Sequence, residues 1–256
     1  ALRRLGATVL DLDCNNFVPI PWRSFDLKLV RKILTGRMAR EYNDRLLDKA
    51  EGFSPDIFLS FKGQYVFPST IRKLRAMGVA TYNYYPDVST VLKNSPWLPE
   101  ALSEYDCVFS TKTFTALDLT ALGYPPRRCE FLPHGYDPEI HCPLEVDEKD
   151  LEKYGADVVF IGTHHWEKEE ALLGLVKRIP NLDLRVWGDG WEGVSDPSLR
   201  PRLGMRSLIG IEYSKGLCSA KIALCILSVA RKGSSSGDLI TSRTFNIPAT
   251  RTLLIH

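Results

Sequence analysis

The sequence predicts an α/β protein with two doubly wound domains, and three observations lead to this fold class. The chain has 256 residues, enough for two domains of ordinary size. Short apolar segments alternate with segments of helical periodicity along its length. Between residues 138 and 156 the sequence becomes polar and acidic, as interdomain connections often are. Because alternating strands and helices form parallel sheets with helices on both faces, we expect two such domains, at 1–142 and 143–256.

The first half alternates strands and helices from its start. The alternating run ATVLDLD predicts a strand at 7–13, and helically spaced apolar residues predict a long helix within 24–52. A second helix, over 68–78, begins near Pro68 and ends at Gly78, because proline fits a first helical turn and glycine a C-terminal cap. A third ends at Gly123. Further strands are expected at 56–63, 79–85, 107–111 and 129–133.

The second half repeats the pattern after the polar connection. Apolar runs predict strands at 157–162, 183–188, 221–227 and 252–255, with a helix over 167–179. A loop of small residues then leads into another helix, in which Ser242 can serve as the N-cap and Arg243 lies in the first turn. A cation is unfavourable at this end of a helix, so the arginine points to a bound anion.

Composition excludes several functional classes. The 33 basic and 31 acidic side chains nearly balance, which argues against a nucleic acid partner. No apolar segment approaches the length of a transmembrane helix, and no leader pattern is visible, so we expect a cytoplasmic protein. The six cysteines form no CxxC pair, and the adjacent His164 and His165 point in different directions, so no metal site is expected.

A glycine-rich segment after the strand at 183–188 matches a dinucleotide-binding pattern. GDGWEG fits G-x-G-x-x-G, but that motif needs a helix that opens on its glycines. Pro197 and Pro201 interrupt the segment that follows. We therefore interpret the glycines as a tight turn and disfavour an NAD-dependent oxidoreductase.

Candidate ligand-binding residues follow the strands, because ligands of open α/β sheets bind beyond the carboxyl ends of the strands. Gly162 and Thr163 end one strand, and Lys168 lies at the start of the next helix. Lys168 either neutralises a phosphate or is a solvated lysine among glutamates. His134 and Gly135 follow the last strand of the first half, where they form either a ligand contact or a structural turn.

Two long segments, 105–138 and 157–190, resemble the corresponding parts of GT-B glycosyltransferases of the family 4 type. More narrowly, FLSFKG, YNYYPDVS and SRTFNIPATRTLLI are similar to the CgeB-like branch, named for a bacterial spore maturation protein. The resemblance implies two Rossmann-like domains that face each other across a cleft. It also implies metal-independent and cofactor-free transfer of a sugar from a UDP- or GDP-linked donor to an unknown acceptor, in bacterial polysaccharide or glycoconjugate synthesis.

The resemblance also assigns roles to residues. Asp238 and Asn246 stand at the separation of the family's Glu-x7-Glu motif, which contacts the donor. Lys168 matches the lysine of the basic pair on the diphosphate, Thr163 stands where an arginine is common, and Arg243 supplies the second charge. These cations and the amides near Ser242 would stabilise the leaving diphosphate. Asp87 is the candidate base if the enzyme inverts, whereas a retaining enzyme needs none.

Two other functions stay open beside glycosyl transfer. Asn246 in place of an acid leaves room for a catalytically degenerate module that binds a nucleotide or glycan, or scaffolds a partner. A nucleotide-sugar epimerase uses the same architecture. Since domains of the resembled family are longer, we expect the first strand of one domain and the C-terminal helices of the other to lie outside these residues.

Overall fold

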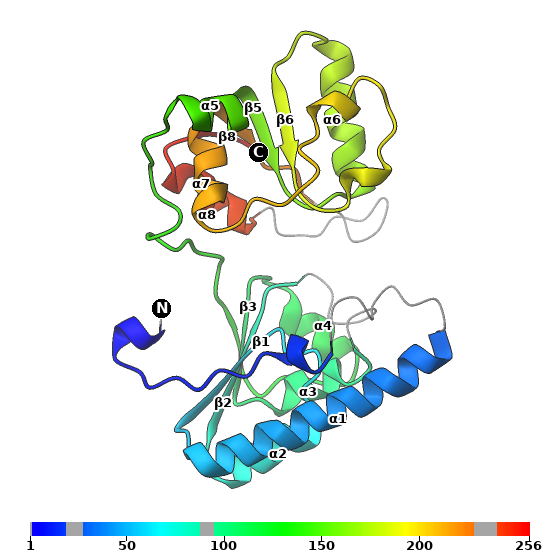
Figure 1. Ribbon diagram of the computed structural model, residues 1–256. Helices are drawn as coiled ribbons and strands as arrows, with labels where there is room; N and C mark the ends of the chain where they lie inside the picture. Colours follow the sequence, from blue (N-terminus) through cyan, green and yellow to red (C-terminus); the bar gives the residue numbers. More distant parts are fainter. Residues whose placement is uncertain (1, 19–27, 88–94, 228–239) are drawn as a thin grey trace. The chain divides into compact units, whose positions relative to one another are not determined.

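The computed structural model describes residues 2–18, 28–87, 95–227 and 240–256 (Figure 1). They form two compact units, Ala1–Leu132 and Pro133–His256, which are considered separately below. Each unit contains a four-stranded parallel sheet with helices packed on it. The predicted α/β class with two Rossmann-like halves is therefore confirmed. The expected domain boundary after residue 142 falls in the opening segment of the second unit.

The first sheet has its strands in the order of the chain. β1 (Ile57–Phe61), β2 (Ala80–Tyr85), β3 (Cys107–Ser110) and β4 (Cys129–Phe131) lie side by side and are all parallel. Leu59 of β1 stands opposite Tyr82 of β2. Because each crossover between parallel strands is right-handed, a sheet built in one direction receives its crossover helices on one face.

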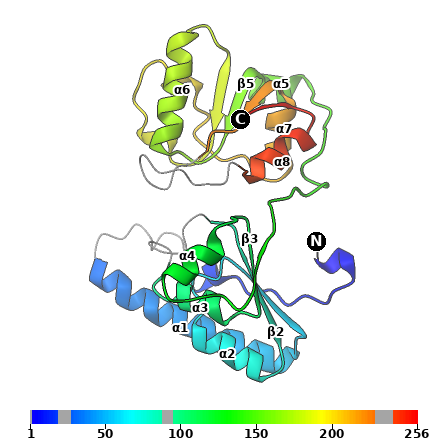
Figure 2. The same ribbon diagram turned by 180° about the vertical axis from the view of Figure 1, so that it is seen from behind.

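The helices of the first unit follow this rule. α1 (Lys28–Phe53), α2 (Pro68–Ala76), α3 (Leu98–Glu104) and α4 (Thr115–Ala121) lie to the same side of the sheet in both views (Figures 1 and 2). Ile71, Leu102 and Leu119 of the last three helices are fully buried in one shared core. The opposite face presents Leu59 and Phe61, which are 48% and 68% exposed, so no described helix of this unit covers it.

The second sheet has a different strand order. β5 (Ala156–Ile161) lies between β6 (Leu184–Trp187) and β7 (Ala220–Leu224), and β8 (Leu253–Ile255) flanks β7. Its helices are α5 (Glu148–Tyr154), α6 (Trp166–Arg178), α7 (Ile211–Cys218) and α8 (Ser242–Ala249).

Helices cover both faces of the second sheet at its inner strand β5. Phe160 packs with Leu172 of α6 on one face, whereas Val159 packs with Leu217 of α7 and Ile247 of α8 on the other. Neighbouring residues of one strand thus belong to two separate cores, as the alternation of side chains along a strand requires. This arrangement makes β5 the central strand of the unit.

The structure corrects two predictions about elements. Residues 7–13 form no strand, since no described strand pairs with them; Arg3 instead donates hydrogen bonds to the Val9 carbonyl and to Asp11. The segment expected to be only a connection contains α5, in which the Asp147 side chain accepts a hydrogen bond from the Asp150 amide at 2.8 Å. The sequence of this helix is too polar for hydrophobic periodicity to predict it, but its N-cap residue Asp147 indicates a helix start.

The chain also contains two helices that the sequence did not predict and several short 3₁₀ turns. The helices α3 and α7 were not anticipated from the sequence. Short 3₁₀ turns occur at Leu2–Leu5, Cys14–Asn16, Trp191–Gly193 and Arg200–Arg202. None of the helices in the described ranges combines the length and apolar character needed to cross a bilayer.

Candidate functional site

The candidate site lies at the carboxyl ends of β5 and β7 in the second unit. From β5 the chain crosses to β6 on one side, and it later returns to β7 on the other side of β5. The connections that leave these two neighbouring strands therefore run to opposite faces of the sheet. Such a topological switch point is where open α/β sheets bind ligands.

Gly162, the first residue after β5, allows a close approach at this point. A Cβ on Gly162 would lie 2.7 Å from the Arg243 Nη1 atom and 3.0 Å from the Phe160 ring. The Gly162 amide donates to the Trp187 carbonyl at 2.8 Å, and its carbonyl accepts from Trp191 Nε1 at 2.9 Å. Gly162 is thus held in place from β6 while a guanidinium group covers it.

Lys168 is buried beside this loop. It lies in the first turn of α6, is 6% exposed, and donates from Nζ to the Thr163 carbonyl at 2.8 Å. Burial, with the nearby charge of Arg243 as a second cause, lowers the pKa of Lys168 to about 8. The lysine is therefore not the solvated surface residue that was one of its two interpretations.

Arg243 reaches the same loop from the first turn of α8. Its Nη2 atom donates to the Ile226 carbonyl, just beyond β7, at 2.8 Å, and its guanidinium lies 5.4 Å from the centroid of the Phe160 ring. The Nε atom is buried with no partner among the described residues. Arg243 thus joins the segments that follow β5 and β7.

Lys168 and Arg243 form a pair of cations, and the nearby acid Glu167 compensates the charge of Lys168 only in part. Neither makes an ion pair with any residue in the described ranges. Burying a positive charge is costly unless an anion or hydrogen-bond acceptor compensates it. The hydrogen bonds of both cations go to neutral carbonyl oxygens, and the Arg243 Nε atom has no partner among the described residues. Two positive charges beside one glycine loop therefore suit an anionic ligand, and the pair comes from elements far apart in the sequence.

The start of α8 differs from its prediction in one respect. Thr241, and not Ser242, is the N-cap: its backbone is extended, and its amide donates to Thr244 Oγ1 at 3.1 Å. Ser242 is already the first helical residue and is exposed. Because the cap is satisfied by threonines, the Ser242 hydroxyl is not engaged as the cap of the helix.

Asn246 lies one turn further along α8 and connects this helix to the segment of Gly135. With its amide nitrogen turned toward Gly135 and Ser242, it donates to their carbonyl oxygens at 3.2 and 3.1 Å. Burial raises the pKa of the nearby Tyr213 to about 12, although Arg243 and Asn246 oppose the shift, and the Tyr213 hydroxyl has no hydrogen-bond partner among the described residues. Asn246 thereby brings the segment of His134 and Gly135 to the helix that carries Arg243.

The glycine pair after β6 forms a turn, as predicted. Gly188 and Gly190 have positive φ angles, and a 3₁₀ turn rather than an α-helix follows at Trp191–Gly193. A Cβ on Gly188 would overlap the Gly162 carbonyl oxygen. The glycines therefore let two loops touch, and no helix opens on them toward a pyrophosphate.

The adjacent histidines each face a different glutamate. His164 Nε2 lies 2.7 Å from Glu169, and His165 Nδ1 contacts Glu167. Across the part of the chain that the structure describes, no three histidine, cysteine or acidic side chains gather as metal ligands would. The histidines are thus partners of the glutamates that flank Lys168.

Two predicted site residues lie apart from this cluster. Asp87 belongs to the first unit, where it forms an ion pair with Lys62 at 3.0 Å. Asp238 lies outside the described residues. Gly162, Thr163, Lys168 and Arg243 lie together at the ends of β5 and β7, and Asn246 links Gly135 to the helix of Arg243. His134 is the residue before Gly135.

Sequence reasoning overlooked three aromatic residues of the site. Phe160 supports Arg243, Trp191 holds the Gly162 carbonyl, and Tyr213 contacts Asn246. Phe160 and Trp191 are fully buried and lie 6.0 Å apart in an edge-on arrangement. Trp191 lies within the glycine turn GDGWEG. A large aromatic residue in such a turn was the sequence signal that could have pointed to the site.

Comparisons with known proteins find similar folds but no similar sequence. A scan against protein-family models finds no match, and a search of curated proteins finds no similar sequence. The fold is similar to that of a sucrose-phosphate synthase from Thermosynechococcus elongatus, with a TM-score of 0.51 and 14% identity over 74% of this chain. The chain covers 54% of that synthase, about half its length.

Weaker likenesses are found to two other structures. One is titled as a UDP-N-acetylglucosamine 2-epimerase from Listeria monocytogenes, with a TM-score of 0.49 and 12% identity over 74% of this chain and 56% of that one. The other is MnaA of S. aureus with UDP, with a TM-score of 0.48 and 11% identity over 74% and 58%. At such identities the likeness to the synthase concerns the fold alone, and it agrees with the predicted GT-B class.

Proposed function

We propose that this chain is part of a GT-B glycosyltransferase, related to the CgeB-like branch that its motifs resemble, and that its second unit binds a UDP- or GDP-linked sugar. The observation that carries the proposal is a pair of cations, the buried Lys168 and the half-buried Arg243, at the glycine loop after β5. A diphosphate is an anion that two converging cations can neutralise. The related fold belongs to a protein named for sucrose phosphate, which is compatible with a sugar ligand.

The proposed chemistry follows from the charges in the site. When the glycosidic bond to the diphosphate breaks, negative charge grows on the leaving oxygen. Lys168 and Arg243 are already positioned by the Thr163 and Ile226 carbonyls, so they would stabilise that charge without rearranging. The cations would thereby take the part that a metal ion plays elsewhere, and we propose transfer without a metal or other cofactor.

Calorimetry with UDP and GDP tests the diphosphate site. Lys168→Ala and Arg243→Ala should each weaken binding by about tenfold or more, because a hydrogen bond to a charged group contributes about 1.5–3 kcal/mol. Lys177→Ala is the matched control, since Lys177 lies on the same helix and its side chain is 65% exposed. Undiminished affinity in both test variants, or an equal loss in the control, would contradict the proposal. The preferred nucleotide also identifies the base of the donor.

Asp87 is proposed as the base of an inverting reaction. Its ion pair with Lys62 keeps a carboxylate fixed just beyond β2. Asp87→Asn should lower the transfer rate about 100-fold or more if the carboxylate accepts the acceptor's proton. A rate within a few-fold of the wild type would remove Asp87 from this role and favour retention.

One observation favours a second candidate, a module that binds without catalysing transfer. Asn246 stands where the resembled family has an acid, and here its amide nitrogen donates to the carbonyl oxygens of Gly135 and Ser242. Release of free sugar or of a glycosylated product from a nucleotide sugar would exclude this candidate. Tight UDP or GDP binding without turnover across a donor and acceptor panel would support it.

A further inference from the structure

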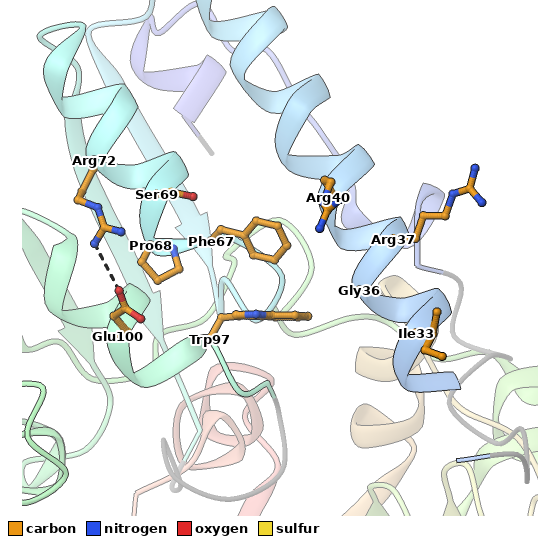
Figure 3. Close-up of a pocket in the computed structure, with 10 residues that line it drawn as sticks. All are labelled: Ile33, Gly36, Arg37, Arg40, Phe67, Pro68, Ser69, Arg72, Trp97 and Glu100. Carbon is orange, nitrogen blue, oxygen red and sulfur yellow. Dashed lines mark hydrogen bonds and ion pairs between the residues drawn. The ribbon is translucent and has the colours of Figure 1, made fainter. Parts of the chain in front are cut away.

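A cavity of about 940 Å³ lies in the first unit, and none of the site residues assigned above lines it. It is bounded by α1 on one side and by the starts of α2 and α3 on the other (Figure 3). Its volume is at the upper end of the range typical of small-molecule sites. Gly36 of α1 faces open space, since a Cβ there would meet no atom within 4 Å.

Two aromatic rings form one wall of this cavity. Phe67, just before α2, and Trp97, just before α3, pack edge-on with their centroids 4.9 Å apart. Figure 3 shows both side chains extended toward α1, and both are only partly buried. The rings therefore offer an apolar surface to a ligand in the cavity.

The charges around the cavity are predominantly positive. Arg37, Arg40 and Arg72 line it together with a single acid, Glu100. Arg72 is paired with Glu104 at 2.6 Å, whereas Arg40 forms no ion pair with any residue that the structure describes. Arg40 lies on α1 across from the aromatic wall, and Arg37 extends outward from the same helix (Figure 3). An unpaired guanidinium that faces two aromatic rings favours an anion with an apolar part.

We propose that this cavity binds a small organic anion whose charged group pairs with Arg40 and whose ring or chain packs on Phe67 and Trp97. The site is confined to the first unit, so it does not depend on the diphosphate site of the second. An inorganic anion would use only the arginine, and a neutral aromatic molecule would use only the rings. A ligand that carries both features should therefore bind more tightly than either.

Phenyl phosphate, inorganic phosphate and benzyl alcohol are suitable probes for this proposal. Binding is followed by NMR titration of the Gly36 amide and the Trp97 indole, with the full chain carrying Lys168→Ala and Arg243→Ala to disable the other cation pair. We expect phenyl phosphate to bind at least tenfold more tightly than each single-feature probe, with shifts at both positions. Equal affinities, or shifts confined to the second unit, would overturn the proposal.

Variants on α1 separate a specific site from a general charge effect. Arg40→Gln should weaken phenyl phosphate binding about tenfold or more, whereas Arg45→Gln, an exposed residue on the same helix that does not line the cavity, should leave it unchanged. Trp97→Leu should weaken phenyl phosphate but not inorganic phosphate. Equal losses in the two arginine variants would contradict the proposal. The proposal would also be overturned if the protein sediments with phosphatidylglycerol vesicles but does not bind phenyl phosphate. That result would indicate that this surface binds a membrane and not a small anion.

Discussion

The two sheets of this protein have the same number of strands but differ in how they are covered. In the first, the order β1-β2-β3-β4 follows the chain, and the described helices pack on one face. In the second, the order β6-β5-β7-β8 reverses direction at β5, and each face has its own core. Since right-handed crossovers fix the face on which each helix lies, strand order alone accounts for this difference.

The difference also explains where the two cations Lys168 and Arg243 meet. Because the strand order reverses, the connections after β5 and β7 run to opposite faces of the sheet. They leave space between them at the carboxyl ends of these two strands. Lys168 follows the first connection and Arg243 the second, so the reversal brings them to one loop. The described strands of the first sheet contain no reversal, and there the strand-end lysine, Lys62, pairs with Asp87 instead.

Core substitutions should test the difference in coverage with the largest effects. Phe160→Ala should lower the free energy of unfolding by about 3–5 kcal/mol and Val159→Ala by about 1–3 kcal/mol, because both side chains are fully buried on opposite faces. Leu59→Ala and Phe61→Ala should cost less than about 1 kcal/mol on the uncovered face. Urea denaturation measures all four. A loss above about 2 kcal/mol at Leu59 would show that this face is covered in the folded protein.

The contact between loops at the switch point should be nearly as sensitive. Gly188→Ala places a Cβ against the Gly162 backbone at a positive φ angle, and should cost about 3 kcal/mol in unfolding free energy. Gly63→Ala in the first unit also stands at a positive φ angle, but its Cβ would approach side-chain atoms of Asn83 and Ser60 at 2.7 and 3.0 Å, whereas that of Gly188 would overlap backbone atoms, so its cost should be smaller. Gly174→Ala, in α6 with open space around it, is the control and should be neutral or stabilising. Equal losses of unfolding free energy for Gly188→Ala and Gly63→Ala would contradict the expectation that the loop contact at the switch point is the more sensitive one.

The smallest expected effect concerns the unpaired lysine. Lys168→Met should raise the unfolding free energy by about 1–3 kcal/mol at pH 7, because it removes a buried charge whose pKa is lowered to about 8. The folded chain releases this proton near pH 8 and the unfolded chain near its ordinary value, so wild-type stability rises with pH between the two. The advantage of the variant should therefore shrink above pH 8.

Lys62→Met supplies the control from the first unit. Its ion pair is partly exposed, so the substitution should cost at most about 1 kcal/mol and stabilise nothing. Denaturation at pH 7 and pH 10 compares the two variants. If the stability gain of Lys168→Met is the same at both pH values, removal of the lysine charge is not its cause.

Much of the fold was accessible from the sequence, and the exceptions have physical reasons. Apolar runs located all eight strands of the two sheets, and Pro68 and Gly78 bounded α2 because their backbone preferences are local. Residues 7–13 have strand-like alternation but no described pairing partner, and α5 is polar with only its N-cap as a signal. Pairing and packing decide such segments, and neither is a property of the segment itself.

The sequence by itself determined the α/β class, the parallel strands, the turn at GDGWEG and the choice of Lys168 and Arg243 as residues of interest. Only the tertiary structure decided that Lys168 is buried, that Arg243 lies over Gly162, and that Asn246 joins Gly135 to α8. The reason is that local preferences act over a few residues, whereas the meeting of residues 162, 168 and 243 depends on the strand order, which the whole chain sets as it buries both faces of the second sheet.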